Sequence, residues 1–169
     1  MIELRAFTLA DAGVIVSWIS GPVELLMWAG PGFRWPLDDP QLAAYAVEPG
    51  RRTWMGVGPE GRLVGHASLR LAADGLSARL GRVLVAPDAR GRGYGTGLLT
   101  QVLTLAFARL GLERVELGVF ARNGNAVRLY ERLGFRVDQV LPDVERVEGQ
   151  SWSVLQMSLA KAGWSAGVG

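Results

Sequence analysis

A glycine-rich segment at residues 83–99 restricts the fold of this chain more than any other stretch. An apolar run of strand character, Val83–Val85, ends before Pro87, and a helical pattern of apolar residues starts at Leu98. Three alternating glycines lie between them, Gly91, Gly93 and Gly95. Glycines at a helix start allow backbone N–H groups to converge on an anion, and the positive end of the helix dipole attracts that anion. The segment therefore predicts a strand, a phosphate-binding loop and a helix.

The spacing of these glycines excludes the two commonest phosphate-binding loops. The chain has no Gly-x-x-x-x-Gly-Lys-Ser/Thr sequence, which a P-loop requires. In a dinucleotide fingerprint that starts at either of the first two glycines, Thr96 or Leu98 would stand where the third glycine belongs. The spacing that is present is Arg90-x-x-Gly93-x-Gly95.

A second patterned segment follows at residues 123–135. Asn123 is a residue type that commonly caps a helix N-terminus, and Gly134 is the type that commonly ends a helix. The apolar residues between them share one helical face (Ala126, Leu129, Tyr130 and Leu133). The segment predicts a short helix with a cap at each end.

Together, the two segments resemble the GNAT superfamily of N-acetyltransferases. Arg90-x-x-Gly93-x-Gly95 resembles the acetyl-CoA signature of that superfamily, Gln/Arg-x-x-Gly-x-Gly/Ala, and it follows a Val-x-Pro strand end as it does there. Residues 123–135 resemble its second motif, Asn-x-x-Ala-x-x-Leu-Tyr-x-x-x-Gly-Phe. The two matches stand in the right order, and the resemblance is clearest between residues 83 and 135.

The resemblance implies both a fold and an activity. The implied fold is α+β: a central, mostly antiparallel twisted sheet flanked by helices, with two strands splayed apart at the acetyl-CoA site. The implied activity is transfer of an acetyl group from acetyl-CoA to a primary amine by direct attack on the thioester, which leaves coenzyme A. The N-terminal part looks like the branch of ribosomal-protein N-terminal and aminoglycoside acetyltransferases. A small amine or a peptide N-terminus is therefore the expected acceptor.

The resemblance also implies which residues hold the cofactor. The pantetheine arm would lie along Val83–Val85 like an added strand, and backbone amides of the glycine loop would bind the pyrophosphate. A backbone N–H near Val85 would polarise the thioester carbonyl. The expected cofactor-binding residues are Val83, Leu84, Val85, Arg90, Gly91, Arg92, Gly93, Tyr94, Gly95, Thr96, Asn123 and Tyr130.

Three residues are candidates for proton transfer. Tyr130 matches the tyrosine that the family often uses as a general acid toward the departing thiolate, although any tyrosine at this spacing would also face the core. The strand before the glycine loop carries no acid, so the candidate general bases are His66, which shares a strand face with Ser68 and Arg70, and Glu116. A chain of water molecules, or an amine that arrives neutral, is an equal alternative.

A Gly/Pro-rich loop at residues 29–37 carries two aromatic residues, and a third stands just before it. Trp28, Phe33 and Trp35 either close the core over the N-terminal helices or line an acceptor pocket. In the family, the corresponding region helps to shape the acceptor site. These aromatics are therefore the candidate substrate-binding residues.

Composition limits the other function classes. The 169 residues predict one domain, residues 1–160, followed by a loose tail at 161–169. Because the chain has no cysteine and one histidine, we expect no disulfide, no thiol nucleophile and no metal site. The net charge of +2 gives no reason to expect nucleic-acid binding, and no apolar run of about 18 residues suggests a membrane span. A cytoplasmic protein is expected, and a homodimer would be common for the superfamily.

The expected elements follow an α+β order. Strands are expected at 2–7, 52–57, 63–71, 78–85, 114–120, 135–140 and 151–159, and helices from Thr8, at 23–28, from Asp38, from Leu98 to Leu110 and from Asn123. The competing hypothesis from a different class is a non-catalytic domain of the same fold that binds or senses acyl-CoA, which the missing acid on the strand before the glycine loop favours.

Overall fold

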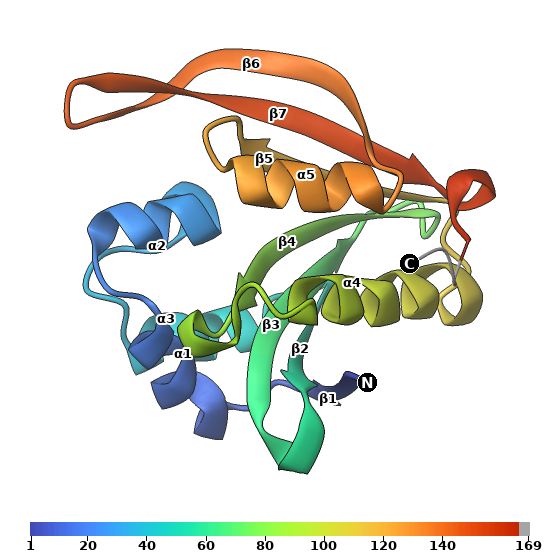
Figure 1. Cartoon of the computed structure of the whole chain (residues 1–169), viewed down its shortest axis with the longest axis horizontal. Coiled ribbons are helices and arrows are strands. Elements are labelled where there is room, and N and C mark those ends of the chain that lie inside the picture. Colours follow the sequence, from blue (N-terminus) through green and yellow to red (C-terminus); the bar gives the residue numbers. More distant parts are fainter. Residues whose placement is uncertain (166–169) are drawn as a thin grey trace.

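One twisted sheet of seven strands carries the fold, with helices on both of its faces (Figure 1). The computed structural model describes residues 1–165. The strand order is β1-β2-β3-β4-β5-β7-β6. The strands are β1 (Glu3–Ala6), β2 (Arg51–Val57), β3 (Leu63–Leu71), β4 (Ser77–Val85), β5 (Arg114–Phe120), β6 (Arg136–Val147) and β7 (Gln150–Ala160). The helices are α1 (Ala12–Trp18), α2 (Pro22–Ala29), α3 (Asp39–Ala46), α4 (Tyr94–Thr104) and α5 (Gly124–Arg132).

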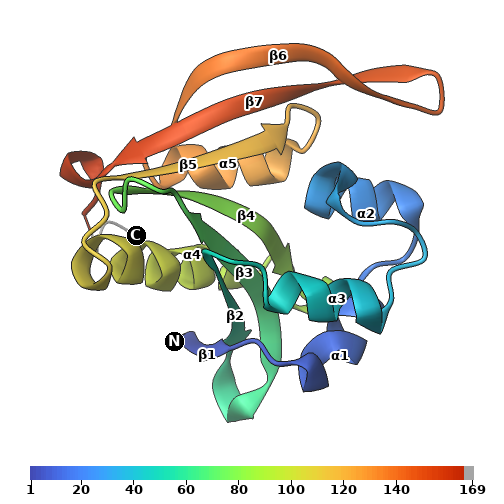
Figure 2. The ribbon, with the colours of Figure 1, turned by 180° about the vertical axis from the view of Figure 1, so that it is seen from behind.

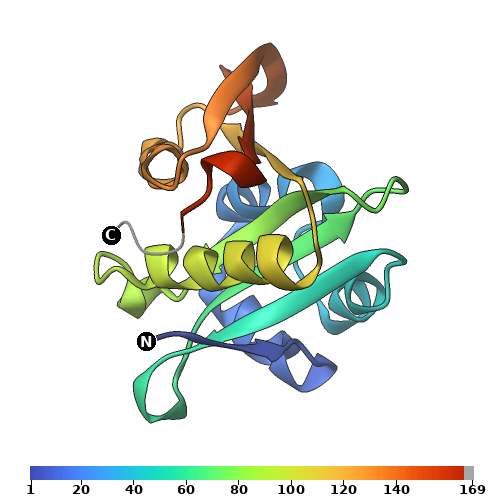
Figure 3. The ribbon, with the colours of Figure 1, turned by 90° about the vertical axis from the view of Figure 1, so that its right-hand side faces the viewer.

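Helices cover the two faces of the sheet (Figure 3). Two hydrophobic clusters hold them there. Leu99 and Leu103 of α4 are fully buried on one face, together with Leu117 of β5. On the other face, Ile15 of α1 and Leu42 of α3 are fully buried. At about 25 cal/mol per Å² of apolar surface, burial of such side chains supplies most of the driving force that fixes these layers.

Local sequence signals explain where the N-terminal helices begin. Thr8 and Asp11 form a capping box at the first helical turn, and Asp11 also pairs with Arg5 at 2.8 Å. The side chain of Asp38 accepts a hydrogen bond from the backbone N–H of Gln41 and caps α3. These groups satisfy backbone donors that would otherwise lack a partner.

Within residues 1–165, β4 and β5 form the only parallel strand pair, and they pair over a shorter stretch than any other two long strands. β4 pairs with β5 from Ser77↔Arg114 to Arg79↔Glu116, and the other pairs in the sheet are antiparallel. Beyond Arg79, β4 and β5 separate, as the back view shows (Figure 2). The sheet therefore opens in its middle, and the edge of β4 that faces β5 has no strand partner from Leu80 onward.

A bulge in β4 lies at the start of this opening. His66 pairs with Leu84 and Ser68 with Gly81, so β4 has one residue more than β3 between these pairs. Arg82 sits in the bulge with φ of 52°, a left-handed conformation that is uncommon for residues other than glycine. The bulge changes the direction in which the side chains of β4 point.

The structure confirms the expected α+β class and most of the expected elements, with three corrections. α4 begins at Tyr94 and not at Leu98, because the glycines of the loop continue into its first turn. β6 and β7 form a longer hairpin than expected, since Pro142 and Asp143 lie in an irregularity of the pairing and do not end the strand. The segment from residue 161 is not a loose tail at its start: Lys161–Gly163 form a helical turn, and Trp164 packs on Phe107 at 6.2 Å. Residues 166–169 of the expected tail lie outside the described residues.

Among residues 1–165, no single helix is long and apolar enough to cross a membrane, and one bent pair, 9–18 with 22–32, passes on length and composition alone.

Candidate active site

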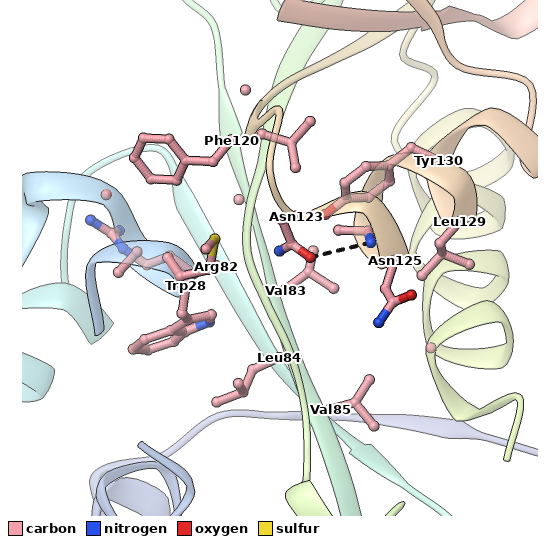
Figure 4. Close-up of a pocket in the computed structure, with 18 of the residues that line it drawn as sticks. Trp28, Arg82, Val83, Leu84, Val85, Phe120, Asn123, Asn125, Leu129 and Tyr130 are labelled. Atoms are coloured by element: carbon pink, nitrogen blue, oxygen red, sulfur yellow. Dashed lines mark hydrogen bonds between the residues drawn. The ribbon is translucent and has the colours of Figure 1, made fainter. Parts of the chain in front are cut away.

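A cleft of about 1500 Å³ occupies the opening between β4 and β5. Helix α2 and strand β4 form one side of it, and α5 with the first turn of α4 forms another. Figure 4 shows Trp28 and Arg82 on one side of Val83–Val85, and Tyr130 with Asn123 on the other. The cleft therefore joins the two motif segments that lie far apart in the sequence.

The glycine loop presents backbone donors at one end of the cleft. Gly93 adopts φ of 80°, which costs a residue with a side chain roughly 1 kcal/mol or more, and it caps α4. The first hydrogen bond of α4 runs from the N–H of Gly97 to the carbonyl oxygen of Gly93, at 3.1 Å. The N–H groups of residues 94–96 precede it and have no intrahelical acceptor, so they form an anion site together with the helix dipole.

A close approach of two helices shapes the same end of the cleft. A Cβ atom at Gly95 would lie 3.2 Å from a methyl group of Leu129 and 3.5 Å from a methyl group of Val85. The missing side chain therefore lets α4 pack closely against α5 and β4. Asn123 begins α5, because its side-chain oxygen accepts a hydrogen bond from the N–H of Ala126 at 3.4 Å (Figure 4).

Tyr130 lies on α5 with its ring buried against the core and its hydroxyl directed from α5 toward β4 (Figure 4). Its ring contacts that of Phe135 edge to face, with 5.7 Å between the centroids. Burial raises the pKa of Tyr130 above its ordinary value, so the hydroxyl stays protonated at neutral pH. The side chain can therefore donate a proton into the cleft.

These two motif segments lie within a region that matches a known family. The sequence profile of the Acetyltransferase (GNAT) family matches residues 23–135, which include α2, the glycine loop and α5. The chain belongs to this family. Residues 23–135 are thus an acetyltransferase domain of the kind that takes acetyl-CoA as its donor.

Individual relatives of this GNAT chain agree with the family match. An N-acetyltransferase of Streptomyces griseus is 35% identical over 139 residues, which cover 79% of this chain and 68% of the relative. An uncharacterized N-acetyltransferase of Mycobacterium tuberculosis is 33% identical over 102 residues, which cover 60% of this chain and 64% of the relative. The structure of spermidine N-acetyltransferase from Vibrio cholerae with CoA and spermine has a TM-score of 0.83 at 22% identity, over 96% of each chain. That likeness shows the shared fold.

Most of the residues expected at the cofactor of this GNAT domain line the cleft, and so does one of the three aromatics. The residues that line it are Trp28, Val83, Leu84, Val85, Arg90, Gly91, Gly93, Tyr94, Gly95, Thr96, Asn123 and Tyr130. Arg92, Phe33, Trp35, His66 and Glu116 do not. Phe33 stacks on Trp28 at 5.7 Å and lines a smaller neighbouring cavity, and Trp35 is about half exposed.

Arg90 is held by neighbours of the loop. Its Nε donates to the carbonyl oxygen of Val85 at 3.2 Å, and its Nη2 lies 3.1 Å from a carboxylate oxygen of Glu24 on α2. Hydrogen bonds from Ser20 and Arg90 keep the pKa of Glu24 below its ordinary value despite partial burial. Arg90 therefore connects α2 to the glycine loop.

His66 lies in the core, on the face covered by α1 and α3. Its side chain is fully buried, and Nε2 is 2.9 Å from the hydroxyl oxygen of Tyr45. Burial, with the nearby charge of Arg82, lowers the pKa of His66 to about 3. A neutral, fully buried histidine that does not line the cleft gives no support to the hypothesis of a general base. The alternation that placed Ser68 and Arg70 on its face was correct: Ser68 accepts a hydrogen bond from Arg51, which lies over the ring of Tyr45, and Arg70 pairs with Glu48 just after α3.

Glu116 lies on β5, outside the cleft. Its carboxylate accepts a hydrogen bond from Nε of Arg114 at 2.8 Å, and its side chain is about half exposed. This position gives no support to a role for Glu116 as a base.

Sequence reasoning missed the charged and polar residues that two parts of the sheet contribute to the cleft. Strands β2 to β4 contribute Arg51, Arg70, Arg79 and Arg82, and the β6–β7 hairpin contributes Glu145, Glu148 and Gln156. Alternation along β4 could have placed Arg79, but the bulge that redirects Arg82 has no glycine at the strained position and no other sequence signal. Among residues 1–165, no group of three His, Asp or Glu side chains is arranged to hold a metal ion.

Proposed function

We propose that this chain transfers the acetyl group of acetyl-CoA to the primary amine of a small molecule. One observation carries the proposal: the glycine loop, the unpaired edge of β4 and the hydroxyl of Tyr130 all belong to one cleft. A Vibrio cholerae relative named spermidine N(1)-acetyltransferase is 28% identical over 81 residues, which supports an acceptor of this kind. A peptide N-terminus is the alternative acceptor.

The residues of the cleft fit the parts of acetyl-CoA. The N–H groups of residues 94–96 and the loop glycines would bind the pyrophosphate, and the free edge of β4 at Val83–Val85 would pair with the amides of the pantetheine arm. Acetyl-CoA supplies the activated acyl group. A backbone N–H near Val85 would donate to the acyl oxygen, where negative charge develops.

Tyr130 would complete the transfer. The amine nitrogen forms a bond to the acyl carbon, the carbon–sulfur bond breaks, and the Tyr130 hydroxyl donates its proton to the sulfur. The acylated nitrogen then loses its extra proton, which returns to the Tyr130 oxygen through water. The chain has no cysteine, so no thiol of the protein carries the acetyl group in between. Before the attack, the ammonium group of the acceptor would lose a proton to water in the open cleft, and the two candidate bases, His66 and Glu116, do not line it.

The experiment measures release of free thiol from acetyl-CoA with a panel of small amines and short peptides, for the wild type and for Tyr130→Phe. We expect turnover with one class of amine and a fall in kcat of about a hundredfold in the variant, since a general acid contributes 10²- to 10⁴-fold. The affinity for coenzyme A, measured by calorimetry, should stay within about threefold, because the ring remains.

Two outcomes would contradict different parts of the proposal, the acetyl transfer itself and the role of Tyr130. Binding of acetyl-CoA without acetylation of any amine would favour the alternative of a non-catalytic acyl-CoA-binding domain. Full activity of Tyr130→Phe would remove the hydroxyl from the mechanism while leaving the acetyltransferase activity in place.

A further inference from the structure

Four arginines form the floor of the cleft on the face opposite α4 and α5, and we call them the arginine cluster: Arg51, Arg70, Arg79 and Arg82. They come from three adjacent strands, β2, β3 and β4, with Arg51 and Arg70 directly paired in register. All four precede Val83 in the sequence, and none belongs to the phosphate-binding loop that follows the end of β4. The cluster is therefore a second cationic region, separate from the loop that fits coenzyme A.

The four arginines of the cluster outnumber the carboxylates that pair with them among the described residues. Glu48 pairs with Arg51 at 2.5 Å and with Arg70 at 3.8 Å. Within the described residues, Arg79 and Arg82 form no ion pair at all. Instead, both terminal nitrogens of Arg79 donate hydrogen bonds to the amide oxygen of Gln156, each at 3.3 Å, across the point where β4 and β5 separate.

Arg82 is the least compensated member of the cluster. Its Nε and Nη1 atoms are buried and have no hydrogen-bond acceptor in the part of the chain that the structure describes. Its guanidinium carbon lies 4.6 Å from the ring centre of Phe33 and 4.7 Å from that of Tyr45, so aromatic faces hold the cation in place. Arginine remains charged even where burial disfavours its charge, and a buried charge is weakly screened.

The cleft also carries carboxylates, on a different part of the sheet. Glu145 and Glu148 line the cleft from the β6–β7 hairpin, and no ion pair neutralises them among residues 1–165. The cleft thus carries cations without an ion pair on β4 and carboxylates without an ion pair on the β6–β7 hairpin, among the described residues. A molecule with an ammonium group and an anionic group matches this arrangement, whereas a molecule with positive charges alone would have to face the arginine cluster.

We propose that the acceptor amine also carries an anionic group, a carboxylate or a phosphate, and that the arginine cluster binds this group. The inference rests on the proposed acetyl transfer and names the class of acceptor within it. Arginine suits either anion, because its planar fork of N–H donors can bind two oxygens at once. The cluster then orients the acceptor so that its amine points toward Val83–Val85.

The test uses matched amines that differ only in the anionic group. Short ω-amino acids are compared with their carboxamides, phosphoethanolamine is compared with ethanolamine, and spermidine represents the purely cationic class. Binding of each amine to the protein saturated with coenzyme A is measured by calorimetry, and acetylation is measured by thiol release. We expect the anionic member of a pair to bind and react roughly tenfold better, which is the effect of one charge-assisted hydrogen bond.

Two variants and one control locate the effect. Arg70→Gln and Arg79→Gln change exposed members of the cluster, and each should reduce the preference for the anionic amine by roughly tenfold. The uncharged member of each pair should change by less than about twofold. Arg52→Gln is the control, because Arg52 is exposed on the same strand as Arg51 and does not line the cleft.

The outcomes separate this inference from the proposed function. If neutral amines or spermidine bind and react as well as the anionic ones, the inference is wrong while the acetyl transfer stands. If anionic amines bind selectively but none is acetylated, the inference stands and the proposed function fails. If no amine of the panel binds, the inference is overturned as well. The carboxylate and phosphate pairs then decide which anion the cluster prefers.

Discussion

Tyr130 and the acceptor amine are the two groups whose protons should govern the rate. Because burial raises the pKa of Tyr130, its hydroxyl stays protonated beyond pH 10, the ordinary value for a tyrosine. We therefore expect kcat/KM to rise with pH until the ammonium group of the acceptor is deprotonated, near pH 10 for a simple alkylamine. With an acceptor of lower pKa, the plateau should begin at correspondingly lower pH.

This account would be contradicted if kcat/KM rose over the same pH range for all acceptors, whatever the pKa of their amine. Such a rise near pH 6 to 7 would indicate a general base on the protein, since the reference pKa of histidine is about 6.5. The profile of Tyr130→Phe should keep the shape of the wild-type profile at a lower rate.

His66 predicts a pH dependence of stability. Its pKa is about 3 in the folded protein, against 6.5 for an ordinary histidine, so below pH 6.5 the unfolded chain binds a proton that the folded chain does not. Stability should therefore fall as the pH falls, by up to about 1.4 kcal/mol per pH unit between pH 6.5 and roughly 5. The chain has a single histidine, which makes this range specific for it.

Urea unfolding at several pH values tests this expectation. In His66→Gln the free energy of unfolding should be nearly constant over the same range, even if it is lower throughout because Tyr45 loses its partner. Below about pH 5, both proteins should lose stability, since Asp11, Glu24 and Glu48 have lowered pKa values in the folded state. An equal slope in wild type and variant above pH 5 would refute the assignment.

Single residues also show what the sequence could predict about the site. Motif spacing placed Gly93, Asn123 and Tyr130 in the cleft, because each serves a local backbone or helix-face requirement. The hypothesis of a general base at His66 gains no support from the structure. Alternation along β3 gave the face of the sheet on which His66 lies, but it could not show that α1 and α3 cover that part of the face. Arg82 was not predictable, because its direction depends on the bulge in β4.

At the level of elements, the loop between β4 and α4 depends on its left-handed glycines. Gly93 (φ 80°) and Gly75 (φ 67°) have open space around an added Cβ, but only Gly93 lies at the cleft. Gly93→Ala and Gly75→Ala should each cost roughly 1 kcal/mol in the free energy of unfolding. Only Gly93→Ala should weaken coenzyme A binding, by roughly tenfold, because it disturbs the N–H groups at the start of α4.

Calorimetry with coenzyme A and urea unfolding together check this pair. Gly75→Ala serves as the matched control for backbone strain. If both variants bind coenzyme A as the wild type does, the loop is not the phosphate site.

Element boundaries were predictable where a cap or a turn marks them, and not elsewhere. The start of α3 and the whole of β5 match expectation, because Asp38 and the flanking turns define them. The length of the β6–β7 hairpin does not, since its pairing continues past Pro142 and is set by contact between the two strands. Glu145 and Glu148 reach the cleft only because of that extra length.

For the whole molecule, the opening of the sheet creates the site. One edge of β4 pairs with β3, while β5 diverges from β4 and pairs with β7. The glycine loop, α5 and α2 line the space between β4 and β5. The family resemblance predicted this opening, whereas periodicity alone gives only the order of strands and helices. The sequence contains no local signal for two strands that separate after a short contact, because separation is a property of the assembled sheet.

Amide hydrogen exchange with and without coenzyme A tests most directly the central claim that this opening is the acetyl-CoA site. We predict that coenzyme A slows exchange at residues 83–85 on the free edge of β4 and at residues 91–96 of the glycine loop. Exchange in the turn around Gly75, which does not line the cleft, should not change. Protection confined to other segments, such as those around the smaller cavity at Phe33 and Tyr45, or no protection at all, would contradict the account.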